Sequence, residues 1–467
     1  MTHMHIAGSI HADYSGIQPQ WLHRPHDINA LDEKLWPRGT RRDDSGTLML
    51  GGASSTELLA RQGSPAYFID EADFRERCAD FRQAFDGWSI FYAGKSLLTK
   101  TVARWVFEEG LNLDVTTMGE MQIALAGGMP AARLGFHGNN KSVEEIEFAL
   151  EQGVGQFIVD SFQEIERIES ACHKLGVQVK ALVRVTTGVE AHTHEYIATA
   201  HEDQKFGLSI LGGQALAGLV RCEHSPHIEL LGIHSHIGSQ IFETMGFEVA
   251  IRRTLKLAHQ FKTATGVELQ ALDLGGGFGI AYTEADSPKP TSELAAAFEE
   301  MIEHECRALG LSRPMLAIEP GRAISGPAGV ALYTVGTIKP VELEGGKIRT
   351  YVSVDGGMSD NIRPALYAAE YSAVVANRVS DAEPLLCRVV GKHCEGGDIL
   401  IRDVFLPSDL AVGDVIAVPG SGAYARSMSS NYNQVPRPPL VSVRDGVSSV
   451  MLRRETLDDL MRLDVGE

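Results

Sequence analysis

The sequence has no run of about 18 consecutive apolar residues, so it predicts no membrane-spanning helix. Its 6 cysteines include no Cys-x-x-Cys pair, which is typical of a reduced, cytoplasmic protein and not of a disulfide scaffold. Basic residues are also few: 42 Lys and Arg face 61 Asp and Glu, which gives a net charge of −19. This balance argues against binding to nucleic acid or to an anionic membrane. The first residues lack a basic segment followed by an apolar one, so no secretory signal peptide is expected.

A chain of 467 residues is expected to form at least two domains, because single hydrophobic cores rarely exceed about 250–300 residues. Residues 1–24 are polar and aperiodic, so we expect a flexible tail there. Residues 25–70 are interpreted as an N-terminal segment that joins the C-terminal domain. From about Pro65 onward, eight short apolar runs alternate with helical periods. These runs are Ser89–Ala93, Leu113–Val115, Leu134–Phe136, Phe157–Val159, Ala181–Val185, Leu230–His236, Ala271–Leu274 and Met315–Ile318.

Eight apolar runs that alternate with helices predict a (β/α)8 barrel of the TIM type over residues 71–332, with a doubly wound open sheet as the alternative. Ser142 with Glu145, and Ser161 with Glu164, predict capping boxes at the start of two of the helices. Beyond about residue 333 the helical periods thin out, which predicts a mostly β domain over 333–467. Its expected strands are Thr350–Val354, Leu385–Val390, Val415–Val418 and Ser448–Leu452.

Chemically capable residues follow the predicted barrel strands, where the active sites of such barrels lie. Lys95 follows the first run, where partial desolvation would lower its pKa and make it nucleophilic; an ordinary surface lysine is the alternative. Gly275, Gly276 and Gly277 follow the seventh run and would form a phosphate cradle or only a tight turn, with Ser239 and Arg322 as nearby donors. Glu319 follows the eighth run. It would either pair with Lys95 or hold a pyridine nitrogen protonated.

His234 and His236 alternate along the sixth run, so both are expected to point to one face. Such a pair could bind a metal, as in metal-dependent hydrolases, with Asp114, Asp160 and His137 as further ligands from other strand ends. Alternatively, one imidazole could stack on a flat cofactor ring. The residues alone leave both readings open.

From about Leu31 to the C-terminus the chain carries a dense series of motifs. They include YAGK at 92–95, HGNNKS at 137–142, HSHIGSQIF at 234–242, DLGGG at 273–277, EPGRAI at 319–324, VSVDGGMSDNIRPALY at 352–367, GKHCE at 391–395 and GAY at 422–424. With these motifs the chain resembles the fold-type III pyridoxal-phosphate decarboxylases, and within them the diaminopimelate decarboxylases. The resemblance implies an alanine racemase-like fold, pyridoxal 5'-phosphate as the cofactor and a homodimer with shared active sites. It implies decarboxylation of meso-2,6-diaminopimelate to L-lysine and CO2, the last step of lysine biosynthesis.

The resemblance also implies roles for the matching residues. Lys95 would hold the cofactor covalently, His236 would stack on its ring, Glu319 would meet the pyridine nitrogen, and Cys394 would donate a proton. No metal is expected. The remaining cofactor contacts would come from Asp114, Ser239, Gly275, Gly276, Gly277, Gly321, Arg322 and Tyr424. The substrate would be bound by Arg322, Arg363, Tyr367, Glu395 and Tyr424, with Cys394 and Glu395 reaching into the barrel of the partner subunit.

Three places depart from the family pattern: Met118 stands where glycine is usual, Gly396 where serine is usual, and Ser96-Leu97 where Ala-Phe is usual. They border the expected site and bear on the identity of the substrate. Two alternatives remain, one that rests on these departures and one that rests on the histidine pair. The first is a diverged decarboxylase with the same cofactor that acts on another diamino or basic amino acid. The second is a metal-dependent barrel hydrolase that uses His234 and His236.

Overall fold

The computed structural model describes residues 19–189, 204–343 and 346–466. Contacts divide them into two compact units. The barrel unit consists of Arg75–Gly279 and Pro288–Ile324, and the β unit consists of the residues up to Phe74, Ile280–Ser287 and the residues from Ser325 onward. The tail predicted over 1–24 lies, up to residue 18, outside the described residues. Within the described ranges, no helix is long and apolar enough to cross a membrane.

The barrel unit is a closed ring of eight parallel strands, counted over the described residues. The ring closes where β8 pairs with β9, with Phe157 opposite Ala181. All eight predicted runs are confirmed as strands, and the closure excludes the open sheet. In ring order the strands are β5 (Ser89–Ala93), β6 (Asn112–Val115), β7 (Leu134–Phe136), β8 (Gln156–Val159), β9 (Val179–Thr186), β11 (Ile228–Ser235), β12 (Ala271–Asp273) and β13 (Met315–Ile318).

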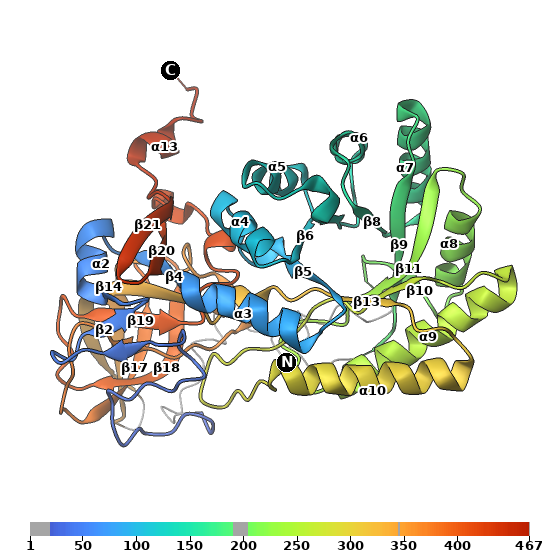
Figure 1. The fold of residues 1–467 in the computed structure, drawn as a ribbon. Helices are drawn as coiled ribbons and strands as arrows, with labels where there is room; N and C mark the ends of the chain where they lie inside the picture. Colours follow the sequence, from blue (N-terminus) through green and yellow to red (C-terminus); the bar gives the residue numbers. More distant parts are fainter. Residues whose placement is uncertain (1–18, 190–203, 344–345, 467) are drawn as a thin grey trace, which may run out of the picture. The chain divides into compact units, whose positions relative to one another are not determined.

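A helix follows each barrel strand and lies outside the ring, which buries the strands on both faces and explains their apolar runs (Figure 1). Short β10 (Leu208–Ser209) extends the sheet beside β9, and α3 (Glu71–Ala84) precedes β5. The helices are α4 (Lys100–Glu108), α5 (Met118–Ala126), α6 (Val143–Gln152), α7 (Phe162–Leu175), α8 (Gln214–Glu223), α9 (Met245–Thr265), α10 (Thr291–Leu309) and α11 (Arg322–Ser325).

The two predicted capping boxes have different outcomes. At α6, Ser142 Oγ accepts the Glu145 N–H and the Glu145 side chain accepts the Ser142 N–H, so this box is confirmed. At α7, Ser161 Oγ accepts the Glu164 N–H, but the Glu164 carboxylate binds Lys141 and the Asp160 N–H instead. The second capping box is therefore wrong, because the Glu164 side chain does not accept the Ser161 N–H and instead binds the buried Lys141.

The β unit is built on a long strand, β14, that pairs with β15 at one end and with β4 and β19 at the other. Because β4 also pairs with β20, the N-terminal segment is part of this sheet. β14 begins at Gly329, so it spans the residue where the second domain was predicted to start. The strands are β4 (Ala66–Asp70), β14 (Gly329–Glu342), β15 (Ile348–Val354), β16 (Val374–Val375), β17 (Pro384–Val390), β18 (Ile399–Pro407), β19 (Val415–Pro419), β20 (Leu440–Arg444) and β21 (Val447–Leu452).

The core of the β unit joins its N-terminal and C-terminal parts. Trp36 and Leu48 pack in one apolar cluster with Phe68 of β4, Leu332 of β14 and Val441 of β20. The smaller elements are β1 (Arg41–Arg42), β2 (Leu48–Leu50), β3 (Ala53–Ser54), α2 (Ser55–Gln62), α12 (Arg363–Tyr367) and α13 (Leu457–Met461). In the same unit, α12 and the turn between β17 and β18 carry predicted site residues.

Candidate active site

Lys95 lies one turn beyond β5, at the carboxyl end of the barrel strands. Two hydrogen bonds stabilise this turn. Ser96 Oγ donates to the Ala93 carbonyl at 2.9 Å, and the Tyr92 hydroxyl donates to the Leu97 carbonyl at 2.8 Å. The Lys95 side chain itself is exposed, in contrast to the partial desolvation predicted from the sequence. The fold thus presents an accessible primary amine on a rigid turn.

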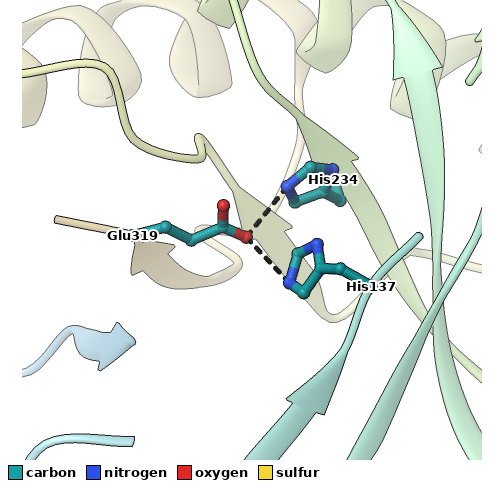
Figure 2. A group of neighbouring side chains, drawn as sticks. All are labelled: His137, His234 and Glu319. Atoms are coloured by element: carbon teal, nitrogen blue, oxygen red, sulfur yellow. Dashed lines mark ion pairs between the residues drawn. The ribbon is translucent and has the colours of Figure 1, made fainter. Parts of the chain in front are cut away.

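Glu319 follows β13 and forms the centre of a buried cluster with two histidines (Figure 2). His234 Nε2, from β11, lies 2.9 Å from Glu319 Oε1, and His137 Nε2, from the turn after β7, lies 3.3 Å from the same oxygen. His137 Nε2 also lies 3.1 Å from Asp114 Oδ1 at the end of β6. Strands from different parts of the ring therefore bring four side chains together inside the barrel.

Burial sets the protonation states in this cluster. It raises the pKa of Asp114 well above its usual range, and the Glu319 charge raises it further; the same two causes act on Asp273. Burial lowers the pKa of His137 to about 3, so this imidazole is neutral near pH 7. Burial also raises the pKa of Glu319, but attraction to His234 and His137 outweighs it and leaves the pKa below its usual range. Glu319 is therefore the carboxylate of the cluster that stays ionised.

A glycine turn lies beside His236. The Gly276 N–H donates to His236 Nδ1 at 3.2 Å, so the imidazole proton is on Nε2. A Cβ on Gly276 would lie 2.3 Å from the Glu319 carbonyl oxygen, and Gly275 has φ +69°, so neither position accepts a larger residue without rearrangement. Burial, followed by the Lys95 charge, lowers the pKa of His236 well below its usual range.

Ser239 and Arg322 form a donor pair close to this turn. Arg322 Nη2 donates to Ser239 Oγ at 2.9 Å, and Arg322 is buried at the start of α11. The preceding residue, Gly321, packs so closely that a Cβ there would lie 2.8 Å from the Ala93 Cβ. A guanidinium, a hydroxyl and the backbone of a glycine turn are the groups that bind phosphate esters.

The structure separates the predicted histidine pair. β11 ends at Ser235, so the alternation does not extend to His236, which faces the glycine turn while His234 faces Glu319. Within the described residues, the group with metal-binding atoms in reach of one another is His137, His234 and Glu319, whose ligand atoms lie within 4.8 Å. This geometry gives no support to the alternative in which His234 and His236 together bind a metal.

In the β unit, Arg363 is buried at the start of α12 between two aromatic rings. Its guanidinium lies 4.6 Å from the ring centroid of Tyr282 and 5.6 Å from that of Tyr371, and Nη1 donates to the Tyr371 hydroxyl. Tyr367, at the other end of α12, is partly buried. The cation is thus held rigidly by aromatic contacts and is not an ion-paired surface arginine.

The turn that carries Cys394 is fixed through its backbone. Asp398 accepts the His393 N–H at 2.7 Å and the Met358 N–H at 2.6 Å, while Asn433 Oδ1 accepts the Cys394 N–H at 3.3 Å. The Cys394 side chain is exposed, whereas the other five cysteines are buried. A thiol on a fixed turn is consistent with a group that delivers a proton.

The remaining predicted residues have distinct settings. Glu395 is exposed and accepts a long hydrogen bond of 3.5 Å from the Tyr432 hydroxyl. Tyr424 has φ +57°, a conformation that costs about 1–3 kcal/mol in a non-glycine residue and is typical of functional sites. Met118 is the first residue of α5, where its N–H donates to Glu145 Oε1 at 3.1 Å, and Gly396 is exposed.

Sequence reasoning missed three supports of these residues. Asp273 accepts the Gly275 N–H at 2.8 Å and so shapes the glycine turn. Lys141, the lysine of the HGNNKS motif, is buried and binds Glu164 at 2.6 Å. Tyr371 holds Arg363 from eight residues further along the chain, beyond the end of α12, and no motif marked it. For Lys141 the signal was its place inside a dense motif.

The barrel residues fit pyridoxal phosphate. An exposed amine suits covalent attachment, the turn at Gly276 with Ser239 and Arg322 suits a phosphate, and ionised Glu319 suits a protonated ring nitrogen. Asp114 Oδ1 and Oδ2 are buried without a hydrogen bond within the described residues, so this carboxyl group has unused capacity to bind a polar group of a ligand.

Comparison with known proteins agrees with this reading. The family described as "Pyridoxal-dependent decarboxylase, pyridoxal binding domain" matches residues 71–326. A barrel of this kind with a β domain defines the class, a pyridoxal-phosphate enzyme of fold type III. Diaminopimelate decarboxylase of Mycobacterium tuberculosis is 49% identical over 94% of this chain and 100% of its own length, and that of Bacillus subtilis is 44% identical over 91% and 97%. The chain belongs to the diaminopimelate decarboxylase family.

Solved structures give the same result. Diaminopimelate decarboxylase from M. jannaschii, in complex with L-lysine, superposes with a TM-score of 0.85 at 28% identity and covers 92% of this chain and 98% of its own. The enzyme from Helicobacter pylori, also complexed with L-lysine, has a TM-score of 0.79 at 31% identity, with 88% and 98% covered.

Proposed function

We propose that this protein catalyses the pyridoxal-phosphate-dependent decarboxylation of meso-2,6-diaminopimelate to L-lysine and CO2, the last step of lysine biosynthesis. The observation that carries the proposal is similarity over nearly the whole chain, at 43–49% identity, to proteins named diaminopimelate decarboxylase. The retained Lys95, Glu319, Arg363 and Cys394 support it.

In the barrel, each residue has one task. Lys95 binds the cofactor covalently, Ser239, Arg322 and the turn at Gly276 bind its phosphate, and His236 stacks on its ring. Asp114, Gly275, Gly277 and Gly321 complete the contribution of the barrel to the cofactor site, and Tyr424 of the β unit is a further cofactor contact. When bound, pyridoxal phosphate supplies an electron sink for the pair left by the broken bond to the carboxylate. Glu319 keeps the ring nitrogen protonated, and its negative charge in a buried site makes it suited to that task.

On the β unit, Arg363 with Tyr367 binds the distal carboxylate of the substrate, because a guanidinium matches a carboxylate with two parallel hydrogen bonds. Glu395 binds the distal ammonium. Cys394 delivers a proton to the carbon that has lost its carboxylate. A substrate without the distal carboxylate would leave the Arg363 cation unpaired, which predicts strong discrimination against lysine and ornithine.

We infer that the protein is a cytoplasmic homodimer in which Cys394 and Glu395 of one subunit complete the site of the other. The exposure of both side chains and the absence of disulfides between the six cysteines are consistent with this. Mixing equal amounts of the inactive variants Lys95→Ala and Cys394→Ala tests it. Random exchange makes about half of the dimers mixed, and each mixed dimer has one intact site of two, so up to about a quarter of the wild-type activity should return. No recovery after verified subunit exchange would contradict shared sites.

The activity is tested by incubating the purified protein with pyridoxal phosphate and meso-diaminopimelate, with lysine, ornithine and arginine as parallel substrates. Lysine and CO2 from diaminopimelate alone are expected. If the cofactor binds but diaminopimelate is not consumed, the diverged decarboxylase becomes the better reading. Gly396→Ser and Met118→Gly are then the reversions to make first.

A further inference from the structure

Two histidines from separate parts of the barrel ring approach a single oxygen of Glu319: His234 Nε2 lies 2.9 Å and His137 Nε2 3.3 Å from Oε1, as ion-pair contacts without hydrogen-bond geometry (Figure 2). We propose that His137 and His234 are positioning residues: they fix the Glu319 carboxylate through Oε1, so that Oε2 serves the ring nitrogen of pyridoxal phosphate. The proposal rests on the assignment of Glu319 to that nitrogen made above. It adds two residues that act on the cofactor only through Glu319.

The geometry makes both rings rigid. The His234 side chain is buried (1% exposed) within β11, and the backbone of His137, directly after β7, is fixed because its main-chain N–H donates to the Val115 carbonyl at 2.8 Å. The two imidazoles contact each other edge to face, with centroids 5.2 Å apart and an interplanar angle of 74°. A glutamate side chain has three rotatable bonds, and two contacts to one oxygen remove most of that freedom before any ligand binds.

The contacts also decide the charge of Glu319. Burial alone favours a neutral carboxyl, and a neutral acid would not hold a ring nitrogen protonated. Attraction to His234 and His137 opposes this effect of burial and keeps the pKa of Glu319 below its usual range, so the two imidazoles favour the anion. Asp114, also 3.1 Å from His137 Nε2, is kept neutral by burial and therefore competes weakly for that donor.

Both rings direct Nε2 to the carboxylate, which allows matched substitutions. A glutamine can place its side-chain N–H groups near the Nε2 position, whereas an asparagine reaches only to Nδ1 and loses the contact. His137→Asn and His234→Asn remove the interaction; His137→Gln and His234→Gln retain it. His137→Leu and His234→Leu repeat the loss with an apolar side chain, in case a buried asparagine prevents folding. His259→Gln, on the exposed face of α9, is the control.

The experiment measures the 15N chemical shift of ring-labelled pyridoxal phosphate in each holoenzyme, with Glu319→Gln as the reference for a lost anion. We expect the Asn and Leu variants to shift towards that reference and to lose about tenfold in kcat with little change in KM. The Gln variants and His259→Gln should keep the wild-type shift. A general packing defect would not separate Asn from Gln in this way.

A wild-type 15N shift in both Asn variants, with a changed shift in Glu319→Gln, would overturn the proposal and leave the role of Glu319 intact. An unchanged shift in Glu319→Gln would overturn both. One tightly held zinc ion per subunit in the purified holoenzyme would also overturn it, because the three groups would then be metal ligands. Failure to decarboxylate diaminopimelate, with the expected shifts present, would instead count against the substrate assignment.

Discussion

The buried ion pair of Lys141 and Glu164 supports the turn that carries His137, and we expect its disruption to destabilise the barrel strongly. Lys141 and Glu164 are each 1% exposed. The Lys141 ammonium donates to Glu164 Oε1 at 2.6 Å, to the Ile158 carbonyl at 2.7 Å and to the Gly138 carbonyl at 2.8 Å. All three N–H groups are thus used, and one of them holds the residue next to His137.

Lys141→Met removes the cation and leaves a buried carboxylate without its partner. Breaking a buried pair on one side costs about 3–5 kcal/mol. For a domain of about 150–250 residues, 1 kcal/mol changes Tm by about 2–4 °C, so the expected drop is about 6–20 °C. Thermal unfolding followed by circular dichroism measures it.

Two further variants make the result specific. Lys141→Met with Glu164→Gln removes the unpaired charge but keeps an acceptor for the Asp160 N–H, so it should recover at least half of the lost Tm. Lys174→Met breaks an exposed pair with Glu147, 2.7 Å long, and should change the stability by less than about 1 kcal/mol. If Lys141→Met behaves like Lys174→Met, the reasoning is refuted.

Three other predictions concern the β unit. Cys394→Ala should bind the cofactor normally and slow turnover by about 10²-fold or more, and steady-state rates equal to wild type would remove the thiol from the mechanism. Arg363→Met should lower kcat/KM for diaminopimelate by about 10²-fold or more through a raised KM; an unchanged KM would place the distal carboxylate elsewhere. Burial raises the pKa of Asp360 to about 7, so its protonated form is favoured by the fold. Wild type should therefore lose up to about 4 kcal/mol of stability between about pH 4 and 7, and no more above pH 7. Asp360→Asn should lack this loss, so the Tm of the variant minus the Tm of wild type should increase from about pH 4 to pH 7. A Tm difference that does not change with pH would contradict the assigned pKa.

The barrel was predictable because its signals are local. Each strand is a short apolar run, and bounds differ from the prediction by at most two residues, as at β9 and β11. β14 was missed because its second half is partly exposed and contains Gly336 and Pro340. The pairing of β4 with β14 joins residues more than 250 positions apart, and no local pattern encodes it.

The location of the site was predictable, because the active sites of such barrels lie at the carboxyl ends of the strands. Lys95, Asp114 and Glu319 were expected at strand ends, and the structure places them there. The convergence of His137 and His234 on one oxygen of Glu319 depends on the curvature of the closed ring, which a linear sequence does not contain. We expected His236 to point to the same face as His234, which is wrong. β11 ends at Ser235, one residue before the end of the apolar run, so the alternation does not extend to His236.

The most direct test of this account asks which residue holds the cofactor. The holoenzyme is reduced with borohydride, digested and analysed by mass spectrometry. The account predicts a pyridoxyl group on the peptide that contains Lys95 and on no other lysine. A modification at a different lysine, or none in a protein that binds pyridoxal phosphate, would contradict it.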